Sequence, residues 1–177
     1  MSLKKRDINA ASGKLGSAAW ILEQTESCAG AEVHQVASLV VPIHRLSERL
    51  RGVAEGAVKP YNLLPTEFEI LQSLLLADRD RGLSPSELYQ ALLMSSGGVT
   101  KLINLLVDKR LICTKPDPSD GRGKRILLTD RGAEIGEKAT AAVVTAEAAL
   151  LAQAFGGHIT SDIAPRLVAA ITRLENA

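Results

Sequence analysis

Apolar side chains recur every three or four residues along most of this chain, which is the period of an amphipathic helix. The longest stripe predicts a helix over residues 31–57, and its members are Val33, Val36, Ala37, Val40, Ile43, Leu46, Leu50, Val53 and Ala54. Pro42 interrupts the stripe, so this segment is either one kinked helix or two helices, the second starting at the proline. Shorter stripes predict helices over about 14–28, from Pro65 to near Asp78, over 130–154 and from Thr160 onward.

The segment 84–87, Ser-Pro-Ser-Glu, has the composition of a helix start. Its first serine can accept from backbone amides, its proline occupies a position where no amide is needed, and its glutamate completes a capping box. We therefore expect a helix over about 84–93, a tight turn, and a second helix over about 96–109.

The second of these helices is amphipathic when it is projected at about 100° per residue. One face contains Val99, Leu102, Ile103 and Leu106, and the opposite face contains Gly97, Thr100, Lys101, Asn104 and Asp108. Small residues and hydrogen-bond donors are what a helix needs to approach base edges in a major groove. An ordinary surface helix would show the same pattern, so the projection alone leaves both interpretations open.

Two short β-prone runs follow, at 111–115 and 125–129. Between them we expect a long turn, because the intervening segment is rich in Pro, Asp, Ser and Gly. Arg122 and Lys124 lie near its tip, and an arginine on a slender arm suits a narrow, electronegative minor groove. Residues 84–129 thus have the order of a winged helix-turn-helix within a mainly α-helical fold with a small β-hairpin.

Composition agrees with a helical, globular chain. Of its 177 residues, 46% are hydrophobic and only 3% aromatic, so the core must be aliphatic. Residues 95–131 contain eight Lys or Arg and four Asp, a net charge of +4 in a chain whose total is +1. A surface that binds phosphates needs such a basic segment, although a solvated surface unrelated to nucleic acid fits the charge equally well.

The sequence points away from several other classes of protein. Cys28 and Cys113 are far apart and lack metal-ligand spacing, the histidines form no cluster, and no apolar run approaches the ~18 residues of a membrane span. We find no zinc-protease His pair, nucleophile elbow or P-loop. We therefore expect a cytoplasmic chain without metal, cofactor, membrane contact or enzymatic activity, and nucleoid-associated when bound to DNA. A winged helix that contacts another protein instead of DNA is the alternative.

Several motifs occur in the order and spacing of one known family. They are Leu83-Ser-Pro-Ser-Glu-Leu, Ser95-Ser-Gly-Gly-Val-Thr-Lys-Leu-Ile, Leu106-Val-Asp-Lys-Arg-Leu-Ile and Asp117-Pro-Ser-Asp-Gly-Arg-Gly-Lys-Arg-Ile-Leu-Leu-Thr-Asp-Arg-Gly. From roughly Val41 to the C-terminus, the sequence resembles the MarR family of bacterial transcription regulators. Asp120-x-Arg122, followed by Leu-Thr-x-x-Gly, is the most recognisable part of that resemblance.

The resemblance implies a homodimer that binds double-stranded DNA, as a repressor. Residues 1–30 would form a partly helical extension, 31–62 and 130–177 the dimerisation region, and 63–129 the DNA-binding lobe. The recognition helices would occupy successive major grooves of a pseudo-palindrome, with half-sites about 34–36 Å apart. The positions that match the family's DNA contacts are Ser95, Ser96, Gly97, Thr100, Lys101, Asn104, Arg122, Lys124 and Arg125, with Asp120 as support for the wing.

The sequence departs from the family pattern at two places. Arg110 stands where the family usually has a glycine that ends the recognition helix, so the arginine either strains the backbone or closes the helix differently. Gly97-Gly98 is unusual near the start of that helix, because each glycine weakens a helix by roughly 0.5–1 kcal/mol relative to alanine. We expect the helix either to begin after these glycines or to become ordered on DNA.

An effector is also implied, because family members commonly bind an anionic aromatic molecule between the dimer helices and the DNA lobe. A urate-responsive subclass has an extra N-terminal helix with a tryptophan, as Trp20 would provide, and it matches at Glu69 and Lys101 but not at Thr114. We expect a small aromatic or purine-like effector near Trp20, His44 and Glu69, unless Trp20 is simply a packing residue. A cysteine-based redox sensor is the alternative, although neither cysteine lies in the first core helix.

Overall fold

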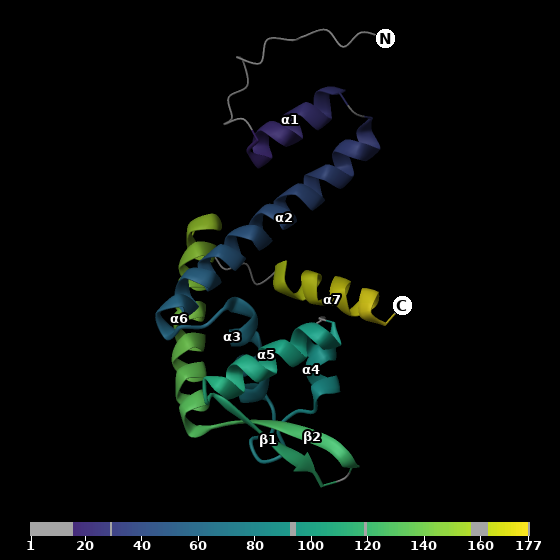
Figure 1. Cartoon of the computed structure of the whole chain (residues 1–177). Helices are drawn as coiled ribbons and strands as arrows, with labels where there is room; N and C mark the ends of the chain where they lie inside the picture. The colour runs from purple at the N-terminus through teal and green to yellow at the C-terminus, as the bar shows by residue number, and fades with distance from the viewer. Residues whose placement is uncertain (1–15, 29, 93–94, 119, 157–162, 177) are drawn as a thin grey trace. The chain divides into compact units, whose positions relative to one another are not determined.

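The structure, a computed structural model, describes residues 16–28, 30–92, 95–118, 120–156 and 163–176, without the side chains of 27–28 and 120–122. In chain order its elements are α1 (Ala18–Cys28), α2 (Ala31–Val58), the 3-10 helix η1 (Lys59–Tyr61), α3 (Pro65–Leu76), α4 (Pro85–Leu92), α5 (Ser96–Asp108), β1 (Ile112–Asp117), β2 (Asp120–Leu128), α6 (Asp130–Ala154) and α7 (Ile163–Glu175) (Figure 1). The fold is mainly α-helical with a small antiparallel hairpin, as the sequence predicts.

The chain forms two compact units, Met1–Gly52 and Val53–Ala177. In the first unit, the Thr25 hydroxyl of α1 lies 3.2 Å from the His34 Nδ1 of α2. α2 continues through Pro42 as a single helix, so the alternative of two helices is wrong.

The core of the second unit is aliphatic, as the low aromatic content predicts. α3 packs against α6 and contacts α4, and α4 packs against α5. The most deeply buried hydrophobic side chains are Val58, Ile70, Leu71, Leu88, Val99, Leu106, Ile126 and Ala139. These residues come from both helices and strands, so one core holds the helical segment and the base of the hairpin together.

The strands of the hairpin are longer than the sequence predicts. The long turn expected between the two strands is wrong, because β2 already begins at Asp120. The antiparallel register shifts between Pro116 and Asp117, which is the signature of a bulge. Glycine and proline in this segment reflect that irregularity of the ladder, and not a loop that separates two short strands.

The loop before α4 is hydrogen-bonded to the base of the hairpin. Leu83 and Ile126 exchange two backbone hydrogen bonds, with N···O distances of 3.0 and 2.8 Å. Gly82, directly before this bridge, has a φ of +61°, and a side chain there would overlap the Ile126 carbonyl. Glycine is therefore needed at this position both for its conformation and for the close approach.

The start of α6 is fixed against the backbone that follows α5. The Thr129 amide donates to the Leu111 carbonyl at 3.1 Å, and the Thr129 hydroxyl donates to the Arg110 carbonyl at 2.8 Å. The same hydroxyl accepts from the Gly132 amide at 3.0 Å, so Thr129 is the N-cap of α6. A side chain at Gly132 would overlap the Leu111 carbonyl, which explains the glycine in the Leu-Thr-x-x-Gly motif.

α5 ends in a Schellman arrangement without a glycine. Arg110 has a φ of 59°, and its amide donates to the Val107 carbonyl at 2.8 Å. The Leu111 amide donates to the Leu106 carbonyl at 2.9 Å, which completes the motif. Of the two expectations for Arg110, the strained conformation is confirmed, and it costs about 1–2 kcal/mol relative to a right-handed one.

No single helix among the described residues is long and apolar enough to cross a membrane, and only the sharply bent pair α4–α5 meets that test of length and composition.

Replacing Gly132 by alanine should lower the free energy of unfolding by about 2 kcal/mol or more, because the new methyl group must displace the Leu111 backbone. The matched control is Gly56→Ala in α2, where a side chain meets open space and should raise that free energy by about 0.5–1 kcal/mol. Urea unfolding followed by circular dichroism measures both. Similar effects of the two substitutions would contradict the packing described at Leu111.

Candidate nucleic-acid interface

The start of α4 is held by the predicted capping box. The Ser84 amide donates to Glu87 Oε2 at 2.7 Å, and the Glu87 amide donates to Ser84 Oγ at 3.2 Å. α4 packs against α5, which begins at Ser96 and so includes both glycines of Gly97-Gly98. The later start considered for α5 is therefore wrong.

α5 is divided lengthwise into an apolar and a polar face, as its projection predicts. Its buried residues are Val99, Leu102, Ile103 and Leu106, and the predicted contact residues Ser95, Ser96, Gly97, Thr100, Lys101 and Asn104 are all exposed. The Thr100 hydroxyl donates to the Ser96 carbonyl at 2.8 Å and lies 3.5 Å from the Tyr89 hydroxyl. One side of the helix is thus fixed in the core, and the other presents polar groups and a glycine to solvent.

The far end of α5 is tied to α3 by an ion pair. Lys109 Nζ lies 2.6 Å from Glu67 Oε2 and donates to the Asn62 carbonyl at 2.8 Å. The Glu67 carboxylate also accepts from the Leu64 amide at 2.8 Å, and its side chain is only 1% exposed. A buried carboxylate needs partners of this kind, so Lys109 fixes where α5 ends relative to α3.

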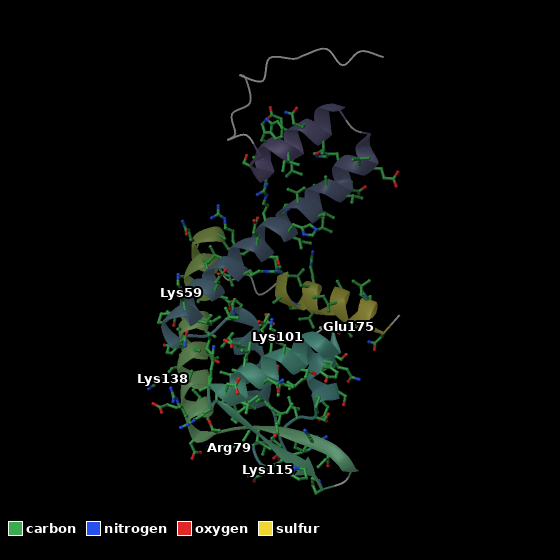
Figure 2. The ribbon with its side chains drawn as sticks, viewed as in Figure 1. Lys59, Arg79, Lys101, Lys115, Lys138 and Glu175 are labelled. Carbon is green, nitrogen blue, oxygen red and sulfur yellow. The ribbon has the colours of Figure 1, made fainter. Side chains whose placement is uncertain are left out.

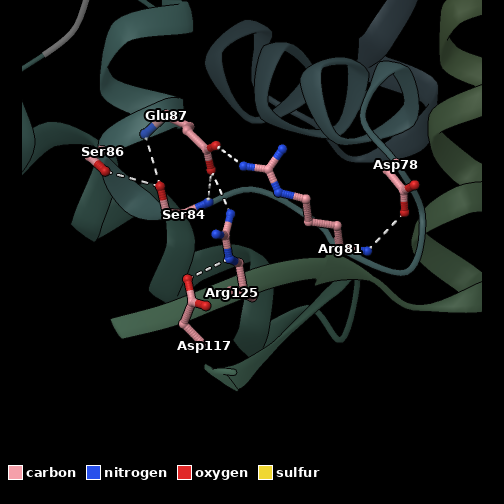
Figure 3. Close-up of polar contacts among 7 residues, drawn as sticks. All are labelled: Asp78, Arg81, Ser84, Ser86, Glu87, Asp117 and Arg125. Carbon is pink, nitrogen blue, oxygen red and sulfur yellow. Dashed lines mark hydrogen bonds and ion pairs between the residues drawn. The ribbon is translucent and has the colours of Figure 1, made fainter. Parts of the chain in front are cut away.

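Two adjacent cations of β2 have different surroundings. Lys124 is exposed, whereas the Arg125 side chain is only 14% exposed. Arg125 Nε lies 2.6 Å from Asp117 Oδ2, and its terminal nitrogen NH1 lies 2.8 Å from Glu87 Oε2 (Figure 3). The sequence predicted both residues as DNA contacts, and only Lys124 has the exposure that such a contact needs.

Glu87 joins three segments of the lobe. Its Oε1 lies 2.7 Å from Arg81 in the loop after α3, and its Oε2 accepts from Ser84 and Arg125 (Figure 3). Hydrogen bonds from the Ser84 amide and hydroxyl, followed by the nearby guanidinium groups, hold the pKa of the Glu87 carboxyl below its usual value. Sequence reasoning missed this cluster, because no spacing rule links Glu87 to an arginine 38 positions away.

A hollow of about 400 Å³ lies between the start of α4 and the hairpin. Its lining residues are Ser84, Pro85, Ser86, Tyr89, Asp117, Gly123 and Lys124. Lys101 projects from α5 and Lys115 from the hairpin, whereas Lys59 and Lys138 come from η1 and α6 (Figure 2). Of these cations and those of the hairpin, Lys124 lines the hollow.

Other predicted residues belong to separate parts of the molecule. Asp120 and Arg122 begin β2, and their side chains lie outside the described residues. Trp20 is half-buried on α1 and His44 is exposed on α2, both in the first unit, whereas Glu69 is exposed on α3 in the second. The roles of these residues in a wing tip and an effector site stay predictions.

Metal and thiol chemistry would depend on His, Cys, Asp and Glu side chains, and the two cysteines lie in different elements. Within the described ranges, no group of three or more His, Cys, Asp or Glu residues is arranged to hold a metal ion. Cys113 is a half-buried free cysteine in β1, and the side chain of Cys28 lies outside the described residues. Redox sensing through either cysteine stays a prediction.

Comparisons with known proteins agree with this geometry. Residues 61–123 match the sequence model of the MarR family. The multiple antibiotic resistance protein MarR of Salmonella typhimurium is 28% identical over 103 residues, which cover 56% of this chain and 69% of that protein. A mutant MarR from E. coli complexed with operator DNA has a TM-score of 0.64 at 23% identity, and the match covers 79% of this chain and 95% of that one. AbsC, a MarR family transcriptional regulator from Streptomyces coelicolor, has a TM-score of 0.69 at 21% identity, over 83% of this chain and 95% of that one.

The fold and these matches define a winged-helix protein, with α4 and α5 as its paired helices and β1–β2 as its wing. Residues 61–123 of the chain match the MarR family, and the fold is that of solved MarR structures. The family match includes α3, α4, α5 and the start of the hairpin.

Proposed function

We propose that this chain is a DNA-binding transcription regulator whose α5 reads a major groove and whose wing enters the adjacent minor groove. The observation that carries the proposal is the lengthwise division of α5 into a face fixed in the core and an exposed polar face. Similar folds have been solved with DNA, namely E. coli MarR with operator DNA and S. aureus MepR in a DNA complex.

The proposed roles follow from chemistry and exposure. Lys101 and Asn104 donate to base edges, while Gly97 allows the helix backbone to come close to them. On the wing, Arg122 enters the minor groove and Lys124 meets a phosphate. The remaining residues proposed for the interface are Ser95, Ser96 and Thr100, with Asp120 as support for the wing.

We further propose that the regulator is a homodimer. α2 exposes Val33, Val36, Leu39, Val40 and Ile43, and α7 exposes Ile163, Leu167, Val168, Ile171 and Leu174. Apolar side chains gathered on exposed helices favour association with a partner. Residues 31–62 and 130–177 would form the dimerisation region and 63–129 the DNA-binding lobe, with 1–30 as an extension. A two-fold dimer would then meet half-sites about 34–36 Å apart.

The proposed regulator is a repressor whose DNA affinity changes with a small aromatic or purine-like effector bound near Trp20, His44 and Glu69. An effector that prefers the free dimer weakens DNA binding by the same factor by which DNA weakens effector binding. A thermal-shift screen of aromatic acids and purines tests this part, because a ligand of the folded chain raises its Tm.

The full chain should bind DNA selected from a random pool, and gel shifts should show affinity falling steeply as salt rises, because phosphate contacts release counterions. Lys101→Ala should reduce discrimination against the wrong base by about 1–3 kcal/mol. Lys59→Ala, which removes the same charge from η1, should leave discrimination unchanged. No DNA complex at low salt would favour a protein-interaction module, and equal effects of the two variants would argue against α5 as the reading helix.

Gly97→Ala should separate the stability of α5 from its approach to DNA. The added methyl group meets open space in the free protein and should stabilise the helix by about 0.5–1 kcal/mol. In the proposed complex it stands between the helix backbone and the base edges, so DNA affinity should fall while the Tm rises. Gel shifts and thermal unfolding measure the two effects, and a parallel gain in both would contradict the proposed contact.

A further inference from the structure

Arg125 is a cation at the base of the wing, and two of its guanidinium nitrogens are paired with carboxylates of the protein. Nε lies 2.6 Å from Asp117 and NH1 lies 2.8 Å from Glu87. The Asp117 side chain is 7% exposed and the Arg125 side chain 14%, so the pair has little contact with water. A phosphate contact would have to take Arg125 from two carboxylates, and removal of one partner leaves a poorly solvated charge.

The wing needs an anchor beyond its own ladder. It consists of two strands, and an isolated two-stranded hairpin is marginally stable at best in water. Its base is joined to the rest of the lobe by the backbone bridge between Leu83 and Ile126 and by the ion pair between Arg125 and Glu87. The bridge fixes where the wing starts, and the ion pair acts one residue nearer its tip.

Glu87 connects the wing to α5 through α4. It caps α4 through Ser84, and α4 packs against α5. Its other oxygen is held by Arg81, so the carboxylate cannot turn toward Arg125 or away from it without losing a second contact. A planar guanidinium between two carboxylates also fixes the orientation of the strand that carries it, because its N–H groups point in fixed directions. A single ammonium group does not have this property.

We propose that Arg125 and Glu87 are positioning residues that set the direction of the wing relative to α4 and α5, so that wing and α5 reach DNA together. This inference rests on the proposed function. A pre-organised wing loses less entropy when it binds DNA. Loss of the Arg125–Glu87 ion pair therefore weakens DNA binding without removing any phosphate contact. Arg125 therefore contributes to affinity through geometry, whereas its neighbour Lys124 contributes through charge.

The test compares two cations that are adjacent in the sequence. Gel shifts on the selected DNA at several salt concentrations give the slope of log affinity against log salt, which falls by about 1 when a phosphate contact is lost. Lys124→Ala should reduce this slope by about 1. Arg125→Leu should weaken binding roughly tenfold at every salt concentration with the wild-type slope. Arg125→Lys, which keeps the charge but not the planar fork, should weaken binding less and also keep the slope.

Glu87→Gln keeps an oxygen that can cap Ser84 and removes the ion pairs. This substitution should weaken DNA binding about as much as Arg125→Leu does. The variant with both substitutions should bind DNA as tightly as the weaker-binding single variant, because both substitutions remove the same contact. Thermal unfolding shows which variants fold. If Arg125→Leu does not fold, Glu87→Gln and Arg125→Lys serve as the test. A slope reduced by about 1 in Arg125→Leu, or additive losses in the double variant, would overturn the inference while the proposed function stands. Wild-type protein without a salt-dependent DNA complex would instead overturn the proposed function.

Discussion

The lobe depends on one backbone carbonyl, that of Leu111. It follows the left-handed Arg110 that ends α5, precedes β1, accepts from the Thr129 amide at 3.1 Å and leaves room only for glycine at position 132. The end of α5, the start of β1, the end of β2 and the start of α6 are therefore placed against one another within a few residues. A displacement of the start of α6 would therefore move the end of α5 and the wing together.

Around that junction, ion pairs join elements that the small aliphatic core does not by itself hold in one arrangement. Lys109 ties the end of α5 to Glu67 of α3, and Arg125 ties the wing to Glu87 of α4. Each pair joins two elements that come from distant parts of the chain and has at least one partner that is largely withdrawn from water. Such pairs are weak sources of net stability, but the loss of one partner is costly, so they favour a single arrangement of helix and wing.

Local rules recovered much of the fold and part of the site. The buried and exposed faces of α5 follow from its helical period, and the capping box at Ser84 follows from residue type, as does the N-cap at Thr129. These signals act within a few residues. The sequence predicts wing strands that are too short, because the pattern of glycine and proline does not distinguish an irregular strand from a turn. Which member of Lys124-Arg125 faces inward depends on carboxylates far away in sequence, so no local pattern shows it. The proposed effector residues lie in two units, and sequence alone cannot bring them together.

The central claim is that α5 occupies a major groove while the wing lies in the neighbouring minor groove. Chemical footprinting of the selected DNA tests it most directly, with dimethyl sulfate reporting guanine N7 in the major groove and hydroxyl radicals reporting sugars along the minor groove. The account predicts major-groove protection in two half-sites one helical turn apart, with flanking minor-groove protection that Arg122→Ala removes while the major-groove protection stays. Protection confined to the sugars, or loss of both signals together in a folded Arg122→Ala variant, would contradict it.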